Sequence, residues 1–333
     1  MRKGALVTGG AGFIGSHLVD RLIGEGQSVT VLDDFSSGRR EHLDDAAGSG
    51  KLRVIEGSVL DSNALDAAID GCSTVYHLAV QCVRRSLGRP IENHAINATG
   101  SLMALEAARR AGIERFVYCS SSEVYGNCGG ERLAEDALCA PVTVYGAAKL
   151  AGEFYARAYY QTYGLPVVIV RPFNAYGPRE HEQGDLAEVI PRFVIRLLNG
   201  LPPIIFGNGE NGRDFTYVSD TVRGIAEAAS CDALLGGIVN IAYGRMISIR
   251  DLAVAAARYC GRAEVKPMFI SPRPGDVDTL QADTRRAQGV LGFRAEIAFE
   301  DGLARYIDWF RAQHNDLSAL LEDEPCNWRM PEA

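Results

Sequence analysis

The sequence lacks the features that mark metal-binding, membrane-spanning and nucleic-acid-binding proteins. Its eight cysteines are scattered, without a C-x-x-C pair or a Cys/His cluster at zinc spacing, so we expect reduced thiols, no disulfide and no metal. Neither lysine nor arginine forms a long run and the formal net charge is -8, which disfavours nucleic acid or an anionic membrane as a partner. The apolar run that begins at residue 4 is too short and glycine-rich for a signal peptide or membrane span, so we expect a cytoplasmic protein.

Short apolar runs alternate with helix-like segments through the first half of the chain. Buried parallel strands read as continuous apolar runs, as Val167-Val168-Ile169-Val170 does. The pattern predicts strands at 4–8, 28–33, 53–56, 73–79, 115–120 and 166–171, with helices at 13–25, 93–111 and 145–163. Such βαβ alternation is typical of an α/β fold with a doubly wound (Rossmann) parallel sheet.

The composition of the sequence changes after Arg171-Pro172, where Pro, Gly and Asn become frequent. Helix-like segments at 186–199 and 219–230 and strand-like segments at 203–206 and 237–241 follow, and 248–310 holds two further helix-like runs. We therefore predict that residues 1–172 and about 215–243 form the sheet domain. Residues from about 173 to 214 and from 244 to 315 form a smaller C-terminal α/β domain, and 316–333 form a loosely packed tail.

Three glycines stand between the first predicted strand and helix. Gly9, Gly12 and Gly15 permit a tight turn, close approach of backbone amides to a pyrophosphate, and packing of the helix on the sheet. Asp33, about twenty residues on, ends the second strand where a carboxylate binds the adenosine ribose hydroxyls and repels a 2′-phosphate. Arg39 and Arg40 lie close enough in sequence to favour NADP, but paired arginines in a polar loop are usually solvated. We predict NAD as the cofactor.

Tyr145 and Lys149 are four residues apart on a predicted helix, so both project from one face. A free tyrosine, with a pKa of about 10, is a poor base at neutral pH, but a neighbouring ammonium and a nicotinamide cation stabilise its phenolate. The pair follows a strand that ends in Cys119-Ser120-Ser121-Ser122. This combination predicts an acid–base pair beside the dinucleotide.

With these motifs the chain resembles the extended short-chain dehydrogenases/reductases of the NAD-dependent nucleotide-sugar epimerase/dehydratase type. The resemblance covers essentially the whole sequence. Its supporting runs are Thr8 to Gly15, His77-Leu78-Ala79, Asn97 with Gly100, Ser120 to Gly126, Tyr145 to Lys149, Arg171 to Arg179, Gly212 to Phe215, and Arg273 to Asp276.

The resemblance implies a nucleotide-diphosphate sugar as substrate and a homodimer built from the helices near 97–111 and 145–163. It implies that Ser121 hydrogen-bonds the sugar 4-hydroxyl, that Asn174 holds the diphosphate, and that Arg213 and Arg273 contact phosphate and ribose. The other residues it places at the substrate are Ser86, Val189 and Asp276. Those it places at the cofactor, besides the glycines, Asp33, Tyr145 and Lys149, are Phe13, Ile14, Asp34, Ser58, Val59, Leu78, Ala79, Asn97, Ser120 and Pro172. Ser58 departs from the family, which usually has an aspartate there against the adenine amino group.

Among family members whose reactions share a 4-keto intermediate, the residue at the position of Glu123 distinguishes one reaction from another. Members that work at C5 or C6 resemble this chain in having a glutamate two residues before the tyrosine of V-Y-G, and a carboxylate there suits removal of the C5 proton. We therefore predict a 4,6-dehydratase or a close 5,6 variant. Ser122 stands where the best-known dehydratases have an aspartate, so a 4-epimerase of UDP-glucose, N-acetylglucosamine or glucuronate remains the alternative. A UDP-glucuronate decarboxylase comes third because its acidic Y-x-E-G-K segment is absent, and an NAD-binding sensor or scaffold is the non-enzymatic alternative.

Overall fold

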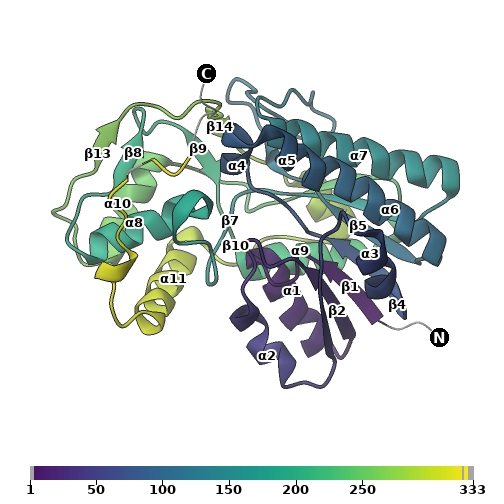
Figure 1. Ribbon diagram of the computed structural model, residues 1–333. Helices are drawn as coiled ribbons and strands as arrows, with labels where there is room; N and C mark the ends of the chain where they lie inside the picture. The colour runs from purple at the N-terminus through teal and green to yellow at the C-terminus, as the bar shows by residue number, and fades with distance from the viewer. Residues whose placement is uncertain (1–3, 325, 329–333) are drawn as a thin grey trace.

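The computed structural model describes residues 4–324 and 326–328 and is built around one seven-stranded parallel sheet (Figure 1). The order of its strands is β11-β6-β5-β4-β1-β2-β3. Their bounds are β1 Gly4–Thr8, β2 Ser28–Asp33, β3 Leu52–Glu56, β4 Cys72–His77, β5 Arg115–Cys119, β6 Val167–Pro172 and β11 Ile238–Ile241. The order reverses between β1 and β4, where a doubly wound sheet opens a crevice for its ligand. The predicted fold class is confirmed.

Helices cover both faces of the sheet because successive strand residues point to opposite sides. Ala5 and Val7 face a core shared with α1 (Phe13–Gly24) and α9 (Val218–Ala229). Leu6, between them, faces a second core. That core is shared with α3 (Ser62–Ile69), α6 (Gly100–Ala111) and α7 (Val144–Tyr163). The sheet is therefore buried on both faces, as its continuous apolar strands require.

The smaller domain lies beside the carboxyl ends of the strands and packs three helices around its own apolar core. These helices are α8 (Val189–Leu198), α10 (Ile249–Tyr259) and α11 (Phe299–Gln313). Three small sheets accompany them, pairing β7 with β10, β8 with β13, and β9 with β12 and β14. The strand bounds are β7 Ala175–Tyr176, β8 Ile204–Phe206, β9 Gly212–Asp214, β10 Thr216–Tyr217, β12 Met246–Ser248, β13 Met268–Ile270 and β14 Thr279–Leu280.

The helix expected at 93–111 is longer and less regular than its pattern suggests. It begins with α5 (Pro90–His94), passes through a π-helical turn at Ala95–Thr99, and continues as α6. A π turn inserts one residue into the helical ladder and rotates the next turns of the helix about its axis, and such turns are frequent near functional sites. Three short helices, α2 (Asp44–Ala47), α3 and α4 (Val83–Gly88), were not predicted from the sequence.

The expectation that the tail from about 316 is loosely packed is wrong for two of its described residues. Asn327 is buried and donates from Nδ2 to the carbonyl of Ala187 at 2.8 Å. The ring of Trp328 packs against Phe206, with ring centroids 4.6 Å apart. Apolar and hydrogen-bonded contacts with the smaller domain thus order a segment whose composition gives no such signal.

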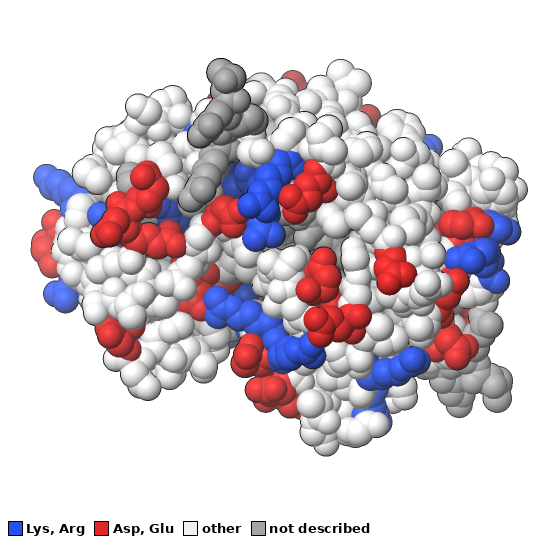
Figure 2. Space-filling model, in the orientation of Figure 1, with Lys and Arg blue, Asp and Glu red and all other residues white. Residues whose placement is uncertain are grey.

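No disulfide joins any of the eight cysteines, all of which lie in the described part of the chain. In the part of the chain that the structure describes, no helix is long and apolar enough to cross a membrane. On the face drawn in Figure 2, basic side chains lie beside acidic ones and form no extended field of one sign.

Candidate active site

The glycine turn after β1 forms one wall of a cavity of about 350 Å³. Gly9 has a φ of 70°, a conformation that favours glycine. A Cβ on Gly15 would lie 2.1 Å from the Gly9 carbonyl oxygen, so only glycine lets α1 start this close to the turn. Gly12 caps α1 in extended conformation, and the free amides of its first turn point out of the helix end. The turn therefore fits a pyrophosphate.

Asp33 ends β2 with both carboxylate oxygens already accepting backbone amides. Oδ2 accepts from Ala11 and Oδ1 from Phe35, each at 2.9 Å. Burial raises the pKa of Asp33, and these two hydrogen bonds oppose the rise. The carboxylate is thus fixed at the cavity, where it suits ribose hydroxyls and repels a 2′-phosphate.

Arg39 and Arg40, which could have favoured NADP, are engaged elsewhere. Arg40 pairs with Glu56 and its guanidinium lies 4.1 Å from the centroid of the Phe35 ring. Arg39 lies 3.5 Å from a carboxylate oxygen of Glu182. Neither arginine lines the cavity.

Most of the predicted cofactor residues line this cavity: Gly9, Gly12, Phe13, Ile14, Gly15, Asp33, Asp34, Val59, Leu78, Ala79, Ser120, Tyr145, Lys149 and Pro172. Two others do not line it. The Ser58 hydroxyl accepts the amide of Leu60 at 3.2 Å and lies outside the cavity lining, so its contact with adenine stays a prediction. Asn97 is fully buried and bonds both backbone groups of Gln81 at 2.9 Å, so it positions the loop that follows β4.

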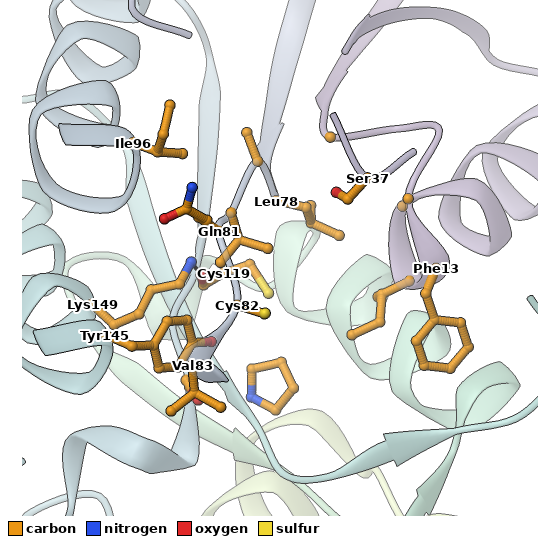
Figure 3. A pocket seen from close by; sticks show the side chains of 18 of the residues that line it. Phe13, Ser37, Leu78, Gln81, Cys82, Val83, Ile96, Cys119, Tyr145 and Lys149 are labelled. Atoms are coloured by element: carbon orange, nitrogen blue, oxygen red, sulfur yellow. Dashed lines mark hydrogen bonds between the residues drawn. The ribbon is translucent and has the colours of Figure 1, made fainter. Parts of the chain in front are cut away.

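Tyr145 and Lys149 project from α7 into the cavity, side by side and opposite Phe13 (Figure 3). Thr143 caps the helix by accepting the amide of Gly146 at 3.1 Å. The Lys149 ammonium donates to the Cys119 carbonyl at 2.9 Å, and burial lowers its pKa. Burial also raises the pKa of Tyr145 above its ordinary value, which the hydrogen bond with Ser121 opposes. Burial therefore keeps the phenol protonated at neutral pH.

Ser121, Ser122 and Glu123 follow β5 and line the same cavity. Ser121 caps the short turn at Ser122–Val124 by accepting the amide of Glu123 at 3.2 Å. Burial raises the pKa of Glu123, which Arg213 and Arg273 oppose. A Cβ on Gly146 would lie 2.7 Å from the Glu123 carbonyl oxygen, so α7 packs directly on this turn. This packing ties the position of Tyr145 to that of Glu123.

A buried ion pair supports Ser120 from behind. Arg171 donates to both carboxylate oxygens of Glu153, from Nε at 2.8 Å and Nη2 at 2.6 Å, and both side chains are buried. The Ser120 hydroxyl donates to the same carboxylate at 2.5 Å. The pair therefore joins β6 and the end of β5 to α7, the helix that carries Tyr145 and Lys149.

A second cavity, of about 160 Å³, extends from the first into the smaller domain. Arg213 and Arg273 both donate to one oxygen of Asp276, at 2.8 and 2.5 Å, so one carboxylate holds two guanidinium groups. Val189 also lines this cavity. Asn174 lines both cavities, and its buried Oδ1 has no hydrogen-bond partner among the described residues. These polar groups fit a diphosphate.

Ser86 is the predicted substrate residue that the structure does not bring to either cavity. It is buried in α4, where its hydroxyl donates to the Val83 carbonyl at 2.6 Å. Two residues that the sequence did not indicate, Arg84 and Glu188, line both cavities instead and pair with each other at 2.8 Å. No motif marks them, because each lies in a segment without a recognisable pattern.

Comparison with known proteins agrees with this site. The model of the NAD dependent epimerase/dehydratase family matches residues 5–242. A UDP-glucose 4-epimerase of Mycolicibacterium smegmatis is 37% identical over 92% of this chain and 98% of its own. The chain belongs to the NAD-dependent epimerase/dehydratase family.

Other relatives in the family include 4,6-dehydratases as well as 4-epimerases. A dTDP-glucose 4,6-dehydratase of an Actinoplanes species is 34% identical over 93% of this chain and 98% of its own. Among solved structures, a UDP-N-acetylglucosamine 4-epimerase from Methanobrevibacter ruminantium superposes with a TM-score of 0.88 at 33% identity, covering 94% of this chain and 99% of that one. The dTDP-glucose 4,6-dehydratase DesIV from Streptomyces venezuelae, solved with NAD, has the same TM-score at 32% identity over 92% and 97%. The predicted family and cofactor are confirmed, and the chain is an NAD-dependent enzyme.

Proposed function

We propose that this enzyme is a nucleotide-sugar 4,6-dehydratase or a close 5,6 variant. The observation that carries the proposal is the place of Glu123, which lines both cavities and therefore lies where they meet. Tyr145 lines the first cavity and the arginines that suit a diphosphate line the second. A sugar joined to a diphosphate would thus present its ring to Tyr145 and Glu123 together.

Tyr145 starts the reaction by taking the proton of the sugar 4-hydroxyl, with Ser121 hydrogen-bonded to the same phenol. Held by the glycine turn and Asp33, bound NAD would supply a reversible hydride acceptor at C4 that is restored in each turnover, by hydride return to C6 in a 4,6-dehydratase or to C4 in the 5,6 variant. Lys149, on the same helix face as Tyr145, favours the ionised phenol through its charge. The sugar then carries a 4-ketone that acidifies the C5 proton.

Glu123 suits both halves of the elimination. Burial raises its pKa, which makes the carboxylate a stronger base for the C5 proton. As the C5–H electrons form the C5–C6 double bond, the C6–O bond breaks and water leaves. Ser122 has no ionisable group at neutral pH, so we assign the proton for the departing hydroxyl to Glu123 as well.

A 4-epimerase is the second candidate, and two observations favour it. Ser122 stands where the best-known dehydratases have an aspartate, and the relative at 37% identity in Mycolicibacterium smegmatis is a UDP-glucose 4-epimerase. A decarboxylase is less well supported because small residues, Gly146 to Ala148, stand between Tyr145 and Lys149.

Product mass separates these reactions. Holoenzyme is incubated with UDP-, dTDP-, GDP- and CDP-linked sugars, and dehydration removes one water while epimerisation leaves the mass unchanged. We expect a product lighter by one water from at least one sugar. Glu123→Gln should lower that turnover by a factor of about 10² to 10⁴, whereas the exposed control Glu114→Gln should match the parent. Epimerised product with full activity in Glu123→Gln would replace the dehydratase by the epimerase.

We also propose that the chain forms a homodimer through α6 and α7. Leu102 on α6 and Phe154 and Tyr163 on α7 are exposed apolar side chains, with Phe154 60% accessible. Light scattering should give twice the mass of the chain, and Phe154→Glu should shift the protein toward the monomer. A monomeric parent would refute this assembly.

A further inference from the structure

The C-terminal segment returns to the second cavity after α11. Asn199 donates from Nδ2 to the Leu317 carbonyl at 2.9 Å, and the Gly184 amide donates to Glu322. Asn327 then donates to the carbonyl of Ala187, just before α8, at 2.8 Å. Three hydrogen bonds along the segment thus bring its last described residues to the cavity wall, which Asn327 and Trp328 both line.

The part of this cavity that the first cavity does not share is aromatic and basic. Phe206 and Trp328 meet there at 4.6 Å with their planes at 72°, and Arg192 lies over the Phe206 ring at 5.8 Å. The shared part holds Glu123 and Asn174. The lining therefore changes from the polar groups shared with the first cavity to arginines suited to phosphates and aromatic rings suited to a base in the unshared part.

We propose that the C-terminal segment completes the base subsite and that Trp328 supplies an aromatic surface on which the nucleotide base stacks. This proposal rests on the proposed nucleotide-sugar substrate but on neither reaction in particular. Trp328 would be a positioning residue for the diphosphate and the sugar, remote from the reacting atoms.

The geometry of the ring pair limits how a base can bind. Phe206 and Trp328 are already in edge-to-face contact, so no base fits between them. Trp328 is only partly buried and lines the cavity, so ring surface remains for a base to cover. Stacking there is tolerant of base identity because every base has a π face. We expect this stacking contact to be made equally in the bound substrate and in the transition state, so its loss raises KM and leaves kcat unchanged.

The chain offers a direct test because it has two tryptophans, Trp309 and Trp328. Trp309 lies on α11, packs against Tyr306 and lines neither cavity, so Trp309→Phe leaves Trp328 as the single indole reporter. UDP, dTDP, GDP and CDP are titrated into this variant, with inorganic pyrophosphate as the ligand that has phosphates but no base. We expect at least one nucleoside diphosphate to quench the emission saturably and pyrophosphate to leave it unchanged.

Binding and kinetics then test the contribution of the ring. Trp328→Ala should weaken that nucleoside diphosphate about tenfold, the effect of losing one stacking contact, and raise the KM of the nucleotide sugar without lowering kcat. Trp328→Phe should retain most of the affinity, and both variants should bind NAD as the parent does. Equal affinity in Trp328→Ala, or quenching by pyrophosphate alone, would overturn the proposal. Tighter binding in Trp328→Ala would also overturn it, since the segment would then block the subsite. None of these three results changes the reaction that product mass assigns to the enzyme.

Discussion

Arg84 and Glu188 form a two-pronged ion pair at the junction of the two cavities. Arg84 Nη2 lies 2.8 Å from Glu188 Oε1, and Nη1 lies 3.1 Å from Oε2. The same guanidinium donates to the carbonyls of Asp185 at 3.0 Å and Leu186 at 2.6 Å. Burial opposes ionisation of Glu188, yet Arg84 holds the pKa of that carboxyl below its ordinary value. One side chain thus fixes the segment that leads into α8.

Arg84→Gln should loosen this segment and weaken substrate binding. The variant removes charge-assisted bonds and leaves the Asp185 and Leu186 carbonyls without their donor. Because the Glu188 side chain is 37% exposed, we expect a loss of about 2 kcal/mol in the free energy of unfolding, below the range for fully buried pairs. The KM of the nucleotide sugar should rise about tenfold, the size of a lost charged contact. Urea unfolding and initial rates measure the two effects.

Arg85→Gln is the matched control. Arg85 lies on α4 next to Arg84 and pairs with Asp185 at 3.1 Å, but it lines neither of the two cavities. Its substitution should change stability by less than about 1 kcal/mol and leave KM unaltered. Equal effects of the two variants would show that Arg84 has no special part in substrate binding.

Gly15→Ala should abolish tight NAD binding with the fold intact. The added Cβ would overlap the Gly9 carbonyl oxygen, so the turn must shift away from the pyrophosphate. We expect at least about a hundredfold rise in the dissociation constant for NAD, equal to roughly 3 kcal/mol of binding energy. Isothermal titration calorimetry measures the affinity, and circular dichroism checks the fold.

Gly24→Ala serves as the control on the same helix, because a Cβ there meets nothing within 4 Å. It should bind NAD normally and unfold at the same or slightly higher temperature, since alanine favours helix over glycine by about 1 kcal/mol or less. If Gly15→Ala also bound NAD normally, close packing at Gly15 would not be what shapes the glycine turn for the pyrophosphate.

Local pattern explains which parts of this site were predictable. The glycine turn, Asp33 and the Tyr145–Lys149 pair each follow from short-range spacing, and the structure gathers them around one cavity. The Arg84–Glu188 pair joins residues 104 positions apart, and nothing in either segment indicates the other. Trp328 lies in a segment whose composition suggests no packing. Ser86 lines neither cavity, because its hydroxyl bonds within α4, and motif position alone does not reveal that bond.

Arg171→Met should destabilise the enzyme more than the substitution of any single exposed ion pair. Glu153 would stay buried without its partner, which typically lowers the free energy of unfolding by about 3–5 kcal/mol. The Ser120 hydroxyl would lose a fixed acceptor, so NAD affinity should fall as well. Arg110→Met, which breaks an exposed pair with Asp66 at 2.8 Å, should change stability by less than about 1 kcal/mol. Comparable thermal midpoints for the two variants would contradict this prediction.

Glu123→Gln should make the enzyme more stable at high pH while it loses turnover. Burial raises the folded-state pKa of Glu123 above its unfolded value, so the folded chain keeps a proton that the unfolded chain has released. Wild-type stability therefore falls as pH rises through the window between the two pKa values, and the loss is complete above it. Each tenfold difference in proton affinity between the two states contributes about 1.4 kcal/mol.

Glutamine carries no charge at any of these pH values, so the variant escapes that loss. Its advantage in the free energy of unfolding should be smallest near pH 4, grow through the window and reach a plateau above it, as urea unfolding of both proteins across pH 4 to 9 will measure. The exposed control Glu114→Gln should show no such rise. An advantage independent of pH would mean that Glu123 has the same pKa in the folded and unfolded chain, which would contradict this prediction. An advantage that still rises at pH 9 would mean that Glu123 stays protonated throughout, and a proton-bearing carboxyl could not serve as the base that removes the C5 proton.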